Sequence, residues 1–288
     1  MGKFRHWIQG FFALCFNGYG KGWLTGNIYT GPGKNVCVPV LNCYSCPGAL
    51  GACPIGSLQA VIGSNGRTFS FYVLGTILFF GTLLGRLICG FLCPFGWLQD
   101  LLHKIPSKKG KEPLWMKKFG VYGKYFFLGV FVLLMPMVLK NEFGIAPPAF
   151  CKYICPAGIL EGGLPLMALQ PYLRSVAGVL FTWKLSLALF IVVLSIFWYR
   201  PFCKYICPLG AIYGLLNKYS AVQLAFSNAK CIHCKKCAHV CKMNVTPYEN
   251  PCSPECIRCT DCVQACPVDA LSLTFYGSKK QEEREVMS

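Results

Sequence analysis

Eight cysteines close to the C-terminus have the residue type and spacing of metal ligands. They form two runs of the pattern Cys-x-x-Cys-x-x-Cys-x-x-x-Cys, the first starting at Cys231 and the second at Cys256. Three thiolates two residues apart can bind three irons of one [4Fe–4S] cubane, while the fourth, after a longer step, reaches the other cluster. We therefore predict one cluster on Cys231, Cys234, Cys237 and Cys266 and a second on Cys256, Cys259, Cys262 and Cys241.

Two structural zinc sites are the alternative interpretation of these runs, because paired Cys-x-x-Cys motifs also bind zinc. Zinc needs two such pairs per site and leaves the third cysteine of each run without a role, so the spacing favours iron–sulfur clusters. The pairing of the fourth cysteines stays open at two points. Lys242 follows Cys241 where a two-cluster run has proline, and Cys252 could compete with Cys256 as a ligand.

Further cysteines occur in Cys-x-x-x-Cys-Pro pairs earlier in the chain. Phe-Cys-Lys-Tyr-Ile-Cys-Pro occurs at 150–156 and again at 202–208, and a third version occupies 89–94. One pair supplies half the ligands of a cubane, so two pairs brought together by packing would complete it. We predict an inner cluster on Cys89, Cys93, Cys203 and Cys207. We predict an outer cluster on Cys151 and Cys155 with two or three of Cys43, Cys46 and Cys53.

These earlier cysteines have two other interpretations. They could be inert buried side chains, or the loop around Cys43 could hold a disulfide if it faces an oxidising compartment. The repeated pairs, each followed by a helix-breaking proline and then a glycine, favour metal loops at helix ends. Four cations lie near the pairs, and they could either stabilise a reduced cluster or anchor at a membrane interface. They are Arg86, Lys152, Arg200 and Lys204.

The composition indicates a membrane protein. Of the 288 residues 54% are hydrophobic and 14% are charged, whereas soluble domains carry about 25% charged residues. Apolar segments near the length of about 20 residues that crosses a bilayer occupy 68–85, 119–139 and 176–199. A fourth span is predicted within 6–28, and the apolar stretch 159–173 could form a re-entrant segment.

The charge pattern sets the expected orientation. The basic segment 99–118 is predicted to be cytoplasmic because short basic loops stay on that side. Alternation then gives a multi-pass protein of the cell membrane with both termini in the cytoplasm, inner cysteines at the cytoplasmic ends of helices and outer cysteines at the opposite ends. The net charge of +17 is interpreted as juxtamembrane charge, and no nucleic-acid partner is predicted.

The predicted fold is mainly α, with about four transmembrane helices and cysteine-rich loops in residues 1–220. Residues 221–276 are predicted to form an α+β module with two clusters, like a ferredoxin. The charged tail 277–288 is expected to be disordered.

The membrane pairs followed by a double cysteine run resemble the NapH/NosR-type membrane ferredoxins, a group of polyferredoxin-like 4Fe-4S binding membrane proteins. The loop 41–48 and the stretch 203–210 are similar to that group as well, and the resemblance extends over residues 36–267. It implies electron transfer between a quinol or cytoplasmic donor and a redox partner. The chain departs from the simplest members by its third Cys-x-x-x-Cys-Pro pair and its additional cysteine loop, so no member's partner is transferred.

We interpret the chain as an electron-transfer subunit rather than a stand-alone enzyme. It contains no convincing nucleophile arrangement and no Gly-x-Gly-x-x-Gly stretch after a strand. Electrons would cross the hydrocarbon layer of about 30 Å between a cytoplasmic donor, or quinol, and an outer acceptor such as a flavoprotein. The alternative is a membrane-bound redox sensor or an assembly factor for a partner oxidoreductase.

Overall fold

The computed structural model describes residues 2–64, 70–110, 112–142, 146–175 and 177–275, so the predicted tail 277–288 lies outside the described residues. The prediction of a mainly helical fold is confirmed. The helices of the first half are α1 Gly2–Phe16, α2 Gly20–Thr25, η1 Pro32–Asn35, α3 Pro54–Gly63, α4 Phe71–Leu84, α5 Leu87–Phe91, α6 Pro94–His103, α7 Leu114–Lys118, η2 Gly120–Tyr122, α8 Gly123–Phe127, η3 Leu128–Leu134 and α9 Met135–Val138.

The second half continues with short helices and ends in two strands. Its helices are α10 Ala149–Tyr153, η4 Gly158–Gly163, α11 Leu164–Leu169, α12 Tyr172–Ser175, α13 Val179–Phe197, α14 Pro201–Tyr205, α15 Pro208–Leu216, η5 Asn217–Tyr219, α16 Lys236–Val240 and α17 Asp261–Gln264. The strands β1 Val222–Phe226 and β2 Leu271–Phe275 pair antiparallel, with Leu224 opposite Leu273.

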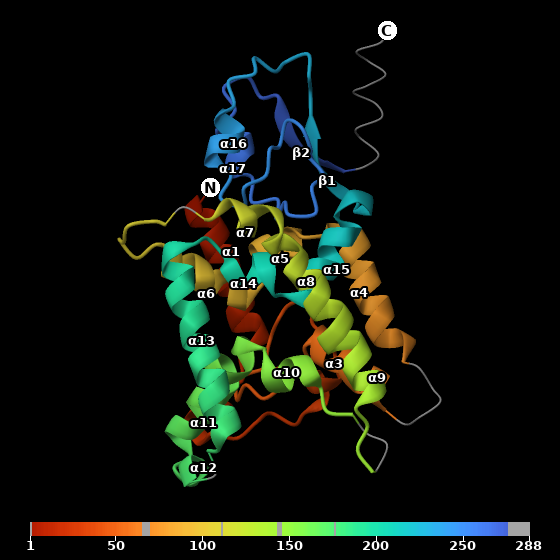
Figure 1. Ribbon diagram of the computed structural model, residues 1–288, viewed down its shortest axis with the longest axis vertical. Helices are drawn as coiled ribbons and strands as arrows, with labels where there is room; N and C mark the ends of the chain where they lie inside the picture. The colour runs from red at the N-terminus through yellow and green to blue at the C-terminus, as the bar shows by residue number, and fades with distance from the viewer. Residues whose placement is uncertain (1, 65–69, 111, 143–145, 176, 276–288) are drawn as a thin grey trace.

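The elements are arranged in tiers along the long axis of the molecule (Figure 1). The C-terminal part, with β1, β2, α16 and α17, forms one end. Beneath it lies a tier of short helices that includes α5, α6, α14 and α15. From this tier α4, α8 to α9 and α13 run toward the other end, where α3, α10 and α11 lie.

Two helical stretches among the described residues are long and apolar enough to cross a membrane, Gly120–Val138 and Val179–Phe197. Both lie within predicted spans, and only 17% of the residues in each are buried, which is unusual for apolar side chains of a soluble monomer. Helix α4, within the predicted span 68–85, has 14 residues and α1 has 15, fewer than the roughly 20 that a span needs. Four membrane spans therefore stay a prediction.

The Cys-Pro pairs set where the short helices begin. Cys53, Cys93 and Cys207 each have an extended backbone at the position before α3, α6 and α15, and the following proline is the first residue of that helix. Proline is favoured there because its missing N–H would have no partner in the first turn. The proline was expected to break a helix, and in the structure it also starts the next one.

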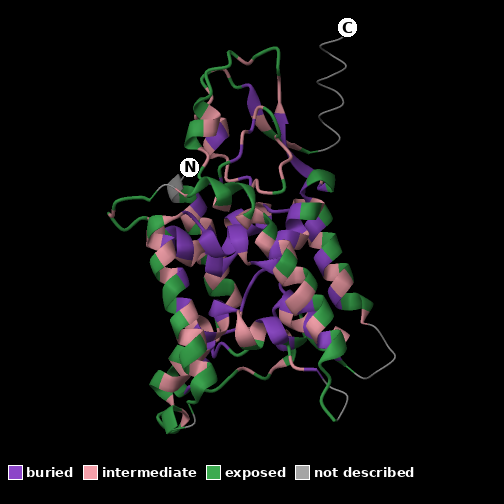
Figure 2. Cartoon of the chain, viewed as in Figure 1, coloured by how far each residue is buried: buried purple, intermediate pink, exposed green. Residues whose placement is uncertain are grey.

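One hydrophobic core joins the C-terminal part to the rest of the chain. It contains Ile257 and Met243 together with Cys89, Cys203 and Phe150. Figure 2 shows that buried residues are concentrated in the tier of short helices beneath the C-terminal part. The cysteines of that tier are therefore held in the best-packed region of the molecule.

Candidate metal centres

The eight C-terminal cysteines line two separate cavities. One is lined by Cys231, Cys234, Cys237 and Cys266. The other is lined by Cys241, Cys256, Cys259 and Cys262. Each set contains three cysteines of one run and the fourth of the other run. Among the described residues Cys252 lies outside both linings, and its Sγ is 3.6 Å from Gln223 Oε1.

The two runs repeat the same backbone conformation. In the first, His233 and Lys235 have positive φ angles on either side of Cys234, and in the second Arg258 and Thr260 flank Cys259 in the same way. The left-handed conformation is uncommon for residues other than glycine. Its repetition at equivalent positions shows that each loop curls to turn its cysteine side chains toward one cavity.

The inner set of cysteines converges in the tier of short helices. Cys89 from α5, Cys93 before α6, Cys203 from α14 and Cys207 before α15 line one cavity, and all four are buried. Residues 39–41 also line this cavity, together with Arg86, Ile88, Phe95, Leu209 and Gly210. The cavity therefore joins two Cys-x-x-x-Cys-Pro pairs that lie more than 100 residues apart in the sequence.

The outer set is placed at the far end of the helices. Cys43, Cys53, Cys151 and Cys155 line one cavity together with Lys34 and Lys184. The described lining does not include Cys46, whose Sγ lies 3.5 Å from Asn17 Oδ1. Of the three loop cysteines that sequence reasoning left as alternatives, the structure brings two to this cavity.

Four thiols around a cavity form the donor set that a [4Fe–4S] cubane requires, with one thiolate for each iron. Among the described residues, no group of three or more His, Cys, Asp or Glu side chains is placed to hold a single metal ion. Burial raises the pKa of the Cys262 thiol to about 12 and that of Cys259 to about 11. Binding of a cluster must therefore release protons from these thiols.

A backbone N–H donates to the second cysteine of the last Cys-Pro pair. The Gly210 N–H reaches Cys207 Sγ at 3.4 Å. Gly96 and Gly158 occupy the equivalent positions after Cys93 and Cys155. Because each glycine lies in the first turn of a helix, where N–H groups lack helical partners, the contact satisfies a donor and favours a negative sulfur.

Two buried arginines connect the inner pairs reciprocally. Arg86 Nη2 donates to the carbonyl oxygen of Cys203 at 3.2 Å, and Arg200 Nη1 donates to that of Cys89 at 2.6 Å. Lys204 is also buried and pairs with Glu112 at 2.6 Å, whereas Lys152 is exposed. Sequence reasoning left interfacial anchoring open for all four cations, and the structure rules it out for the three that are buried.

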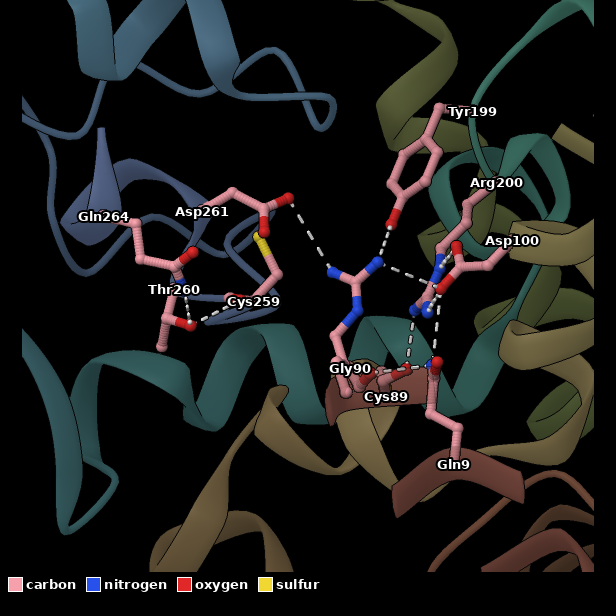
Figure 3. A network of polar contacts seen from close by, with 11 residues as sticks. Gln9, Cys89, Gly90, Asp100, Tyr199, Arg200, Cys259, Thr260, Asp261 and Gln264 are labelled. Carbon is pink, nitrogen blue, oxygen red and sulfur yellow. Dashed lines mark hydrogen bonds and ion pairs between the residues drawn. The ribbon is translucent and has the colours of Figure 1, made fainter. Parts of the chain in front are cut away.

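Asp100 neutralises Arg200 from two sides. Its Oδ1 and Oδ2 accept from Arg200 Nε at 2.7 Å and Nη2 at 2.5 Å, and Arg5 and Gln9 contact the same carboxylate (Figure 3). Burial opposes ionisation of Asp100, but Arg200 and Arg5 outweigh it and lower the pKa of the carboxyl to about 2. Arg200 itself has a positive φ of 49°, a strained conformation that this pairing holds in place.

A second ion cluster fastens the C-terminal part to the tier of short helices. Glu255, next to the ligand candidate Cys256, pairs with Arg86 at 2.9 Å and with Lys124. Arg86 also donates to the carbonyl oxygen of Pro254 at 2.7 Å. Arg86 therefore contacts the loops of two cysteine cavities at once.

Sequence reasoning missed Gln59, Gln99, Asp100 and Glu255. Two of them carry a signal that could have found them, because Cys-Pro-x-Gly-x-Leu-Gln occurs at 53–59 and again at 93–99. The two acidic residues carry no comparable signal, since their partners are distant in the sequence.

The comparisons with known proteins agree with this donor chemistry. The family model of a 4Fe-4S binding domain matches residues 66–112, 125–164 and 180–227, and each matched segment contains one Cys-x-x-x-Cys-Pro pair. The chain is therefore an iron–sulfur protein. No solved structure matches it.

The relatives define the family. The chain is 32% identical to the uncharacterized protein MJ0750 of Methanocaldococcus jannaschii, over 79% of this chain and 88% of the relative. It is 27% identical to the putative electron transport protein YccM of Escherichia coli, over 67% of this chain and 52% of YccM. It is 28% identical to the regulatory protein NosR of Stutzerimonas stutzeri, over 56% of this chain but only 20% of NosR. The chain belongs to the NapH/NosR-type family of 4Fe-4S electron-transfer proteins.

The position of Cys252 leads to a prediction for the second C-terminal cavity. We expect Cys256→Ala to lower the iron content of the anaerobically purified chain by about four atoms, the content of one cubane. Cys252→Ala is expected to leave the iron content unchanged, because its sulfur faces Gln223. Iron analysis of the two variants checks this, and the reverse pattern would make Cys252 the ligand.

Proposed function

We propose that the chain is an integral membrane protein that relays electrons through four [4Fe–4S] clusters between its C-terminal part and the opposite end of the helices. The observation that carries the proposal is the set of four cavities, each lined by four cysteines, with two in the C-terminal part, one in the tier of short helices and one at the opposite end. Each cluster, when bound, would accept and donate one electron. The protein's own residues supply the thiolate ligands, the neutralising cations and the packing that fixes the spacing between the sites.

Close packing supports electron transfer between the C-terminal module and the inner cluster. A Cβ on Gly90 would lie only 2.5 Å from the carbonyl oxygen of Ile257, so the two backbones approach as closely as glycine permits. Gly90 follows Cys89, and Ile257 follows Cys256. One ligand candidate of each cavity therefore lies directly beside this contact.

The loop 36–46 supports transfer between the inner and outer clusters. Leu41 lines both cavities, Pro39 lines the inner cavity and Cys43 lines the outer one. The hydroxyl of Tyr213 donates to the carbonyl oxygen of Pro39 at 3.0 Å and so holds the loop against α15. A short covalent path through this loop would join the two membrane clusters.

The two long apolar helices support membrane insertion, and we propose four spans with both termini in the cytoplasm. In this orientation the C-terminal module, which we propose to be ferredoxin-like, takes electrons from a cytoplasmic donor. The outer cluster gives them to a redox partner such as a flavoprotein. The name of the relative YccM, a putative electron transport protein, supports an electron-transfer role.

An apolar cavity favours a quinol as a second candidate donor. It lies between α3, α4, η3 and α9, and Leu58, Ile77 and Met137 are among its lining residues. Its side chains suit a lipid-soluble ring and tail, because ligand sites are mainly apolar with a few polar groups. Ser64 and Lys140 are the polar groups in the described lining.

Iron and acid-labile sulfide per chain, measured on the anaerobically purified protein, test the relay. We expect about sixteen irons and a matching amount of sulfide, because each of four cubanes holds four irons. A value near eight would confine the clusters to the C-terminal module. The alternative function as a redox sensor or assembly factor would then fit better, since the membrane cysteines would carry no electrons.

A further inference from the structure

Two buried glutamines occupy equivalent places beside the inner and outer cavities. Gln59 in α3 and Gln99 in α6 are each six residues after the cysteine that precedes the helix, in the repeated sequence Cys-Pro-x-Gly-x-Leu-Gln. Their exposed fractions are 0% and 1%. A buried amide side chain is retained only where its polar atoms find partners.

Each glutamine reaches across to the other cysteine pair of its cavity. Gln99 Nε2 donates to Cys203 Sγ at 3.1 Å, and Gln99 Oε1 accepts from the Phe202 N–H at 3.2 Å. Gln59 Nε2 lies 3.4 Å from Cys151 Sγ, and its Oε1 accepts from the Phe150 N–H at 2.9 Å. Each amide therefore contacts the phenylalanine N–H and the first cysteine sulfur of its own copy of the Phe-Cys-Lys-Tyr-Ile-Cys-Pro segment.

The chemistry of the partners determines which end of each amide faces the sulfur. A backbone N–H can only donate, so the amide oxygen must face Phe150 or Phe202 and the NH₂ group must face the sulfur. The second N–H of each amide donates to the carbonyl oxygen four residues earlier, that of Ile55 at 3.1 Å or Phe95 at 3.4 Å. Each amide therefore makes three hydrogen bonds, to a backbone N–H, a cysteine sulfur and a backbone carbonyl oxygen, at equivalent positions.

The Cys-Pro-x-Gly turn occurs twice more, but different side chains occupy the position of the glutamine. Glu161 accepts from the Cys43 N–H at 2.8 Å, and Tyr213 donates to the carbonyl oxygen of Pro39. Among the described residues, both of these side chains hydrogen-bond to backbone atoms of the loop 36–46. Each membrane cavity therefore receives one side-chain amide on a cysteine sulfur, from a glutamine.

We propose that Gln99 and Gln59 are positioning residues that raise the reduction potentials of the inner and outer clusters by donating a hydrogen bond to the ligating sulfurs of Cys203 and Cys151. The inference rests on the proposed function, because it requires clusters in both cavities. Reduction adds one electron to the cluster, and part of the added negative charge falls on the ligand sulfurs. A donor to these sulfurs stabilises the reduced state more than the oxidised state, and burial strengthens the effect.

EPR-monitored redox titration of the full chain in detergent tests the proposal with Gln99→Met and Gln59→Met. Methionine has nearly the same length but no N–H group. We expect Gln99→Met to lower the ratio of reduced to oxidised inner cluster about tenfold at a fixed potential, which is a shift of about 59 mV for a one-electron couple. The outer cluster should keep its potential. Gln59→Met should give the converse result.

The matched control is Gln9→Met. Gln9 is also fully buried, and its amide donates to the carbonyl oxygen of Gly90 at 2.9 Å and contacts Asp100. Its partner Gly90 follows Cys89, and within the described part of the chain its amide donates to oxygen atoms and not to sulfur. Its replacement should leave both potentials unchanged, and a shift equal to that of Gln99→Met would attribute the effect to burial of a glutamine and overturn the proposal.

Gln99→Glu separates tuning of the potential from support of the backbone. A carboxylate still accepts from the Phe202 N–H but places a negative charge at the sulfur, so the inner cluster should become harder to reduce than with methionine. Retained iron with unchanged potentials in both Gln99 variants would overturn the proposal. Loss of iron from both would also overturn it, since the amide would then be needed for assembly. The iron content of the wild-type chain reports separately on the proposed function.

Discussion

Replacing Cys203 with alanine is expected to lower the iron content of the purified chain from about sixteen to about twelve atoms, a loss of one cubane. Cys203 is buried beside Cys89, Cys93 and Cys207, so no solvent-exposed group is in place to replace the missing thiolate. Because the inner cavity lies between the C-terminal part and the outer cavity, reduction of the outer cluster through the C-terminal module should stop. Iron analysis measures the loss of the cubane. EPR of the protein reduced directly with dithionite, compared with protein reduced through its C-terminal module by a soluble donor, measures the loss of electron transfer to the outer cluster.

Cys15→Ala is the matched control for this experiment. Cys15 is exposed on α1 and lies outside the four described cavity linings, so its loss should leave iron and electron transfer intact. Unchanged iron in Cys203→Ala would contradict the inner cluster. If the EPR signals of the C-terminal clusters are lost as well, the Cys203→Ala variant has misfolded. Cys207→Ala and Cys89→Ala would then show whether loss of an inner cysteine removes the inner cluster alone.

Asp100→Asn is expected to destabilise the chain by about 3–5 kcal/mol, the usual cost of removing one partner from a buried ion pair. Asparagine has almost the same shape, but the guanidinium group of Arg200 would remain buried without a counter-charge, and Arg5 would keep only its 3.9 Å ion pair with Asp261. The loss should also loosen the contact of Arg200 with the carbonyl oxygen of Cys89. Denaturant unfolding in detergent, followed by tryptophan fluorescence, measures the change in the free energy of unfolding.

Glu249→Gln is the control for the loss of a carboxylate. Glu249 is exposed and contacts Thr246, and surface substitutions of this kind change stability by roughly 0.5 kcal/mol or less. A comparably small effect of Asp100→Asn would contradict the role of the buried pair.

The folded pKa of Asp100 lies below its usual value of 3.8, at about 2. Its contribution is therefore complete above pH 3.8 and is lost only as the pH falls toward 2, so measurements near pH 7 report the full pair.

Much of the C-terminal site could be predicted because its information is local. Cys231, Cys234 and Cys237 lie in one short loop, and their spacing leaves few ways to surround a cluster. The assignment of Cys266 to that set required only the longer step after each third cysteine. The structure lines one cavity with these four residues, and their role as ligands stays a prediction.

The partners of the earlier cysteines could be predicted less completely. The sequence offers no feature that separates Cys43, Cys46 and Cys53 as ligand candidates. Only the folded path of the loop shows that Cys43 and Cys53 line the same cavity as Cys151. The span 68–85 shows a similar limit. Its apolar composition predicted a helix, but α4 begins at Phe71 and ends before Gly85, whose φ of 55° stops the helix.

The sequence by itself determined the chemistry of this protein, because thiolate spacing and the prolines that start helices act over a few residues. It identified an iron–sulfur protein, its family and its mainly helical fold. The tertiary structure alone decided what surrounds the sulfurs. Arg86 meets Cys203 across 117 residues of sequence and Gln99 meets it across 104. Such contacts depend on how the helices pack, and no pattern within one segment specifies that packing.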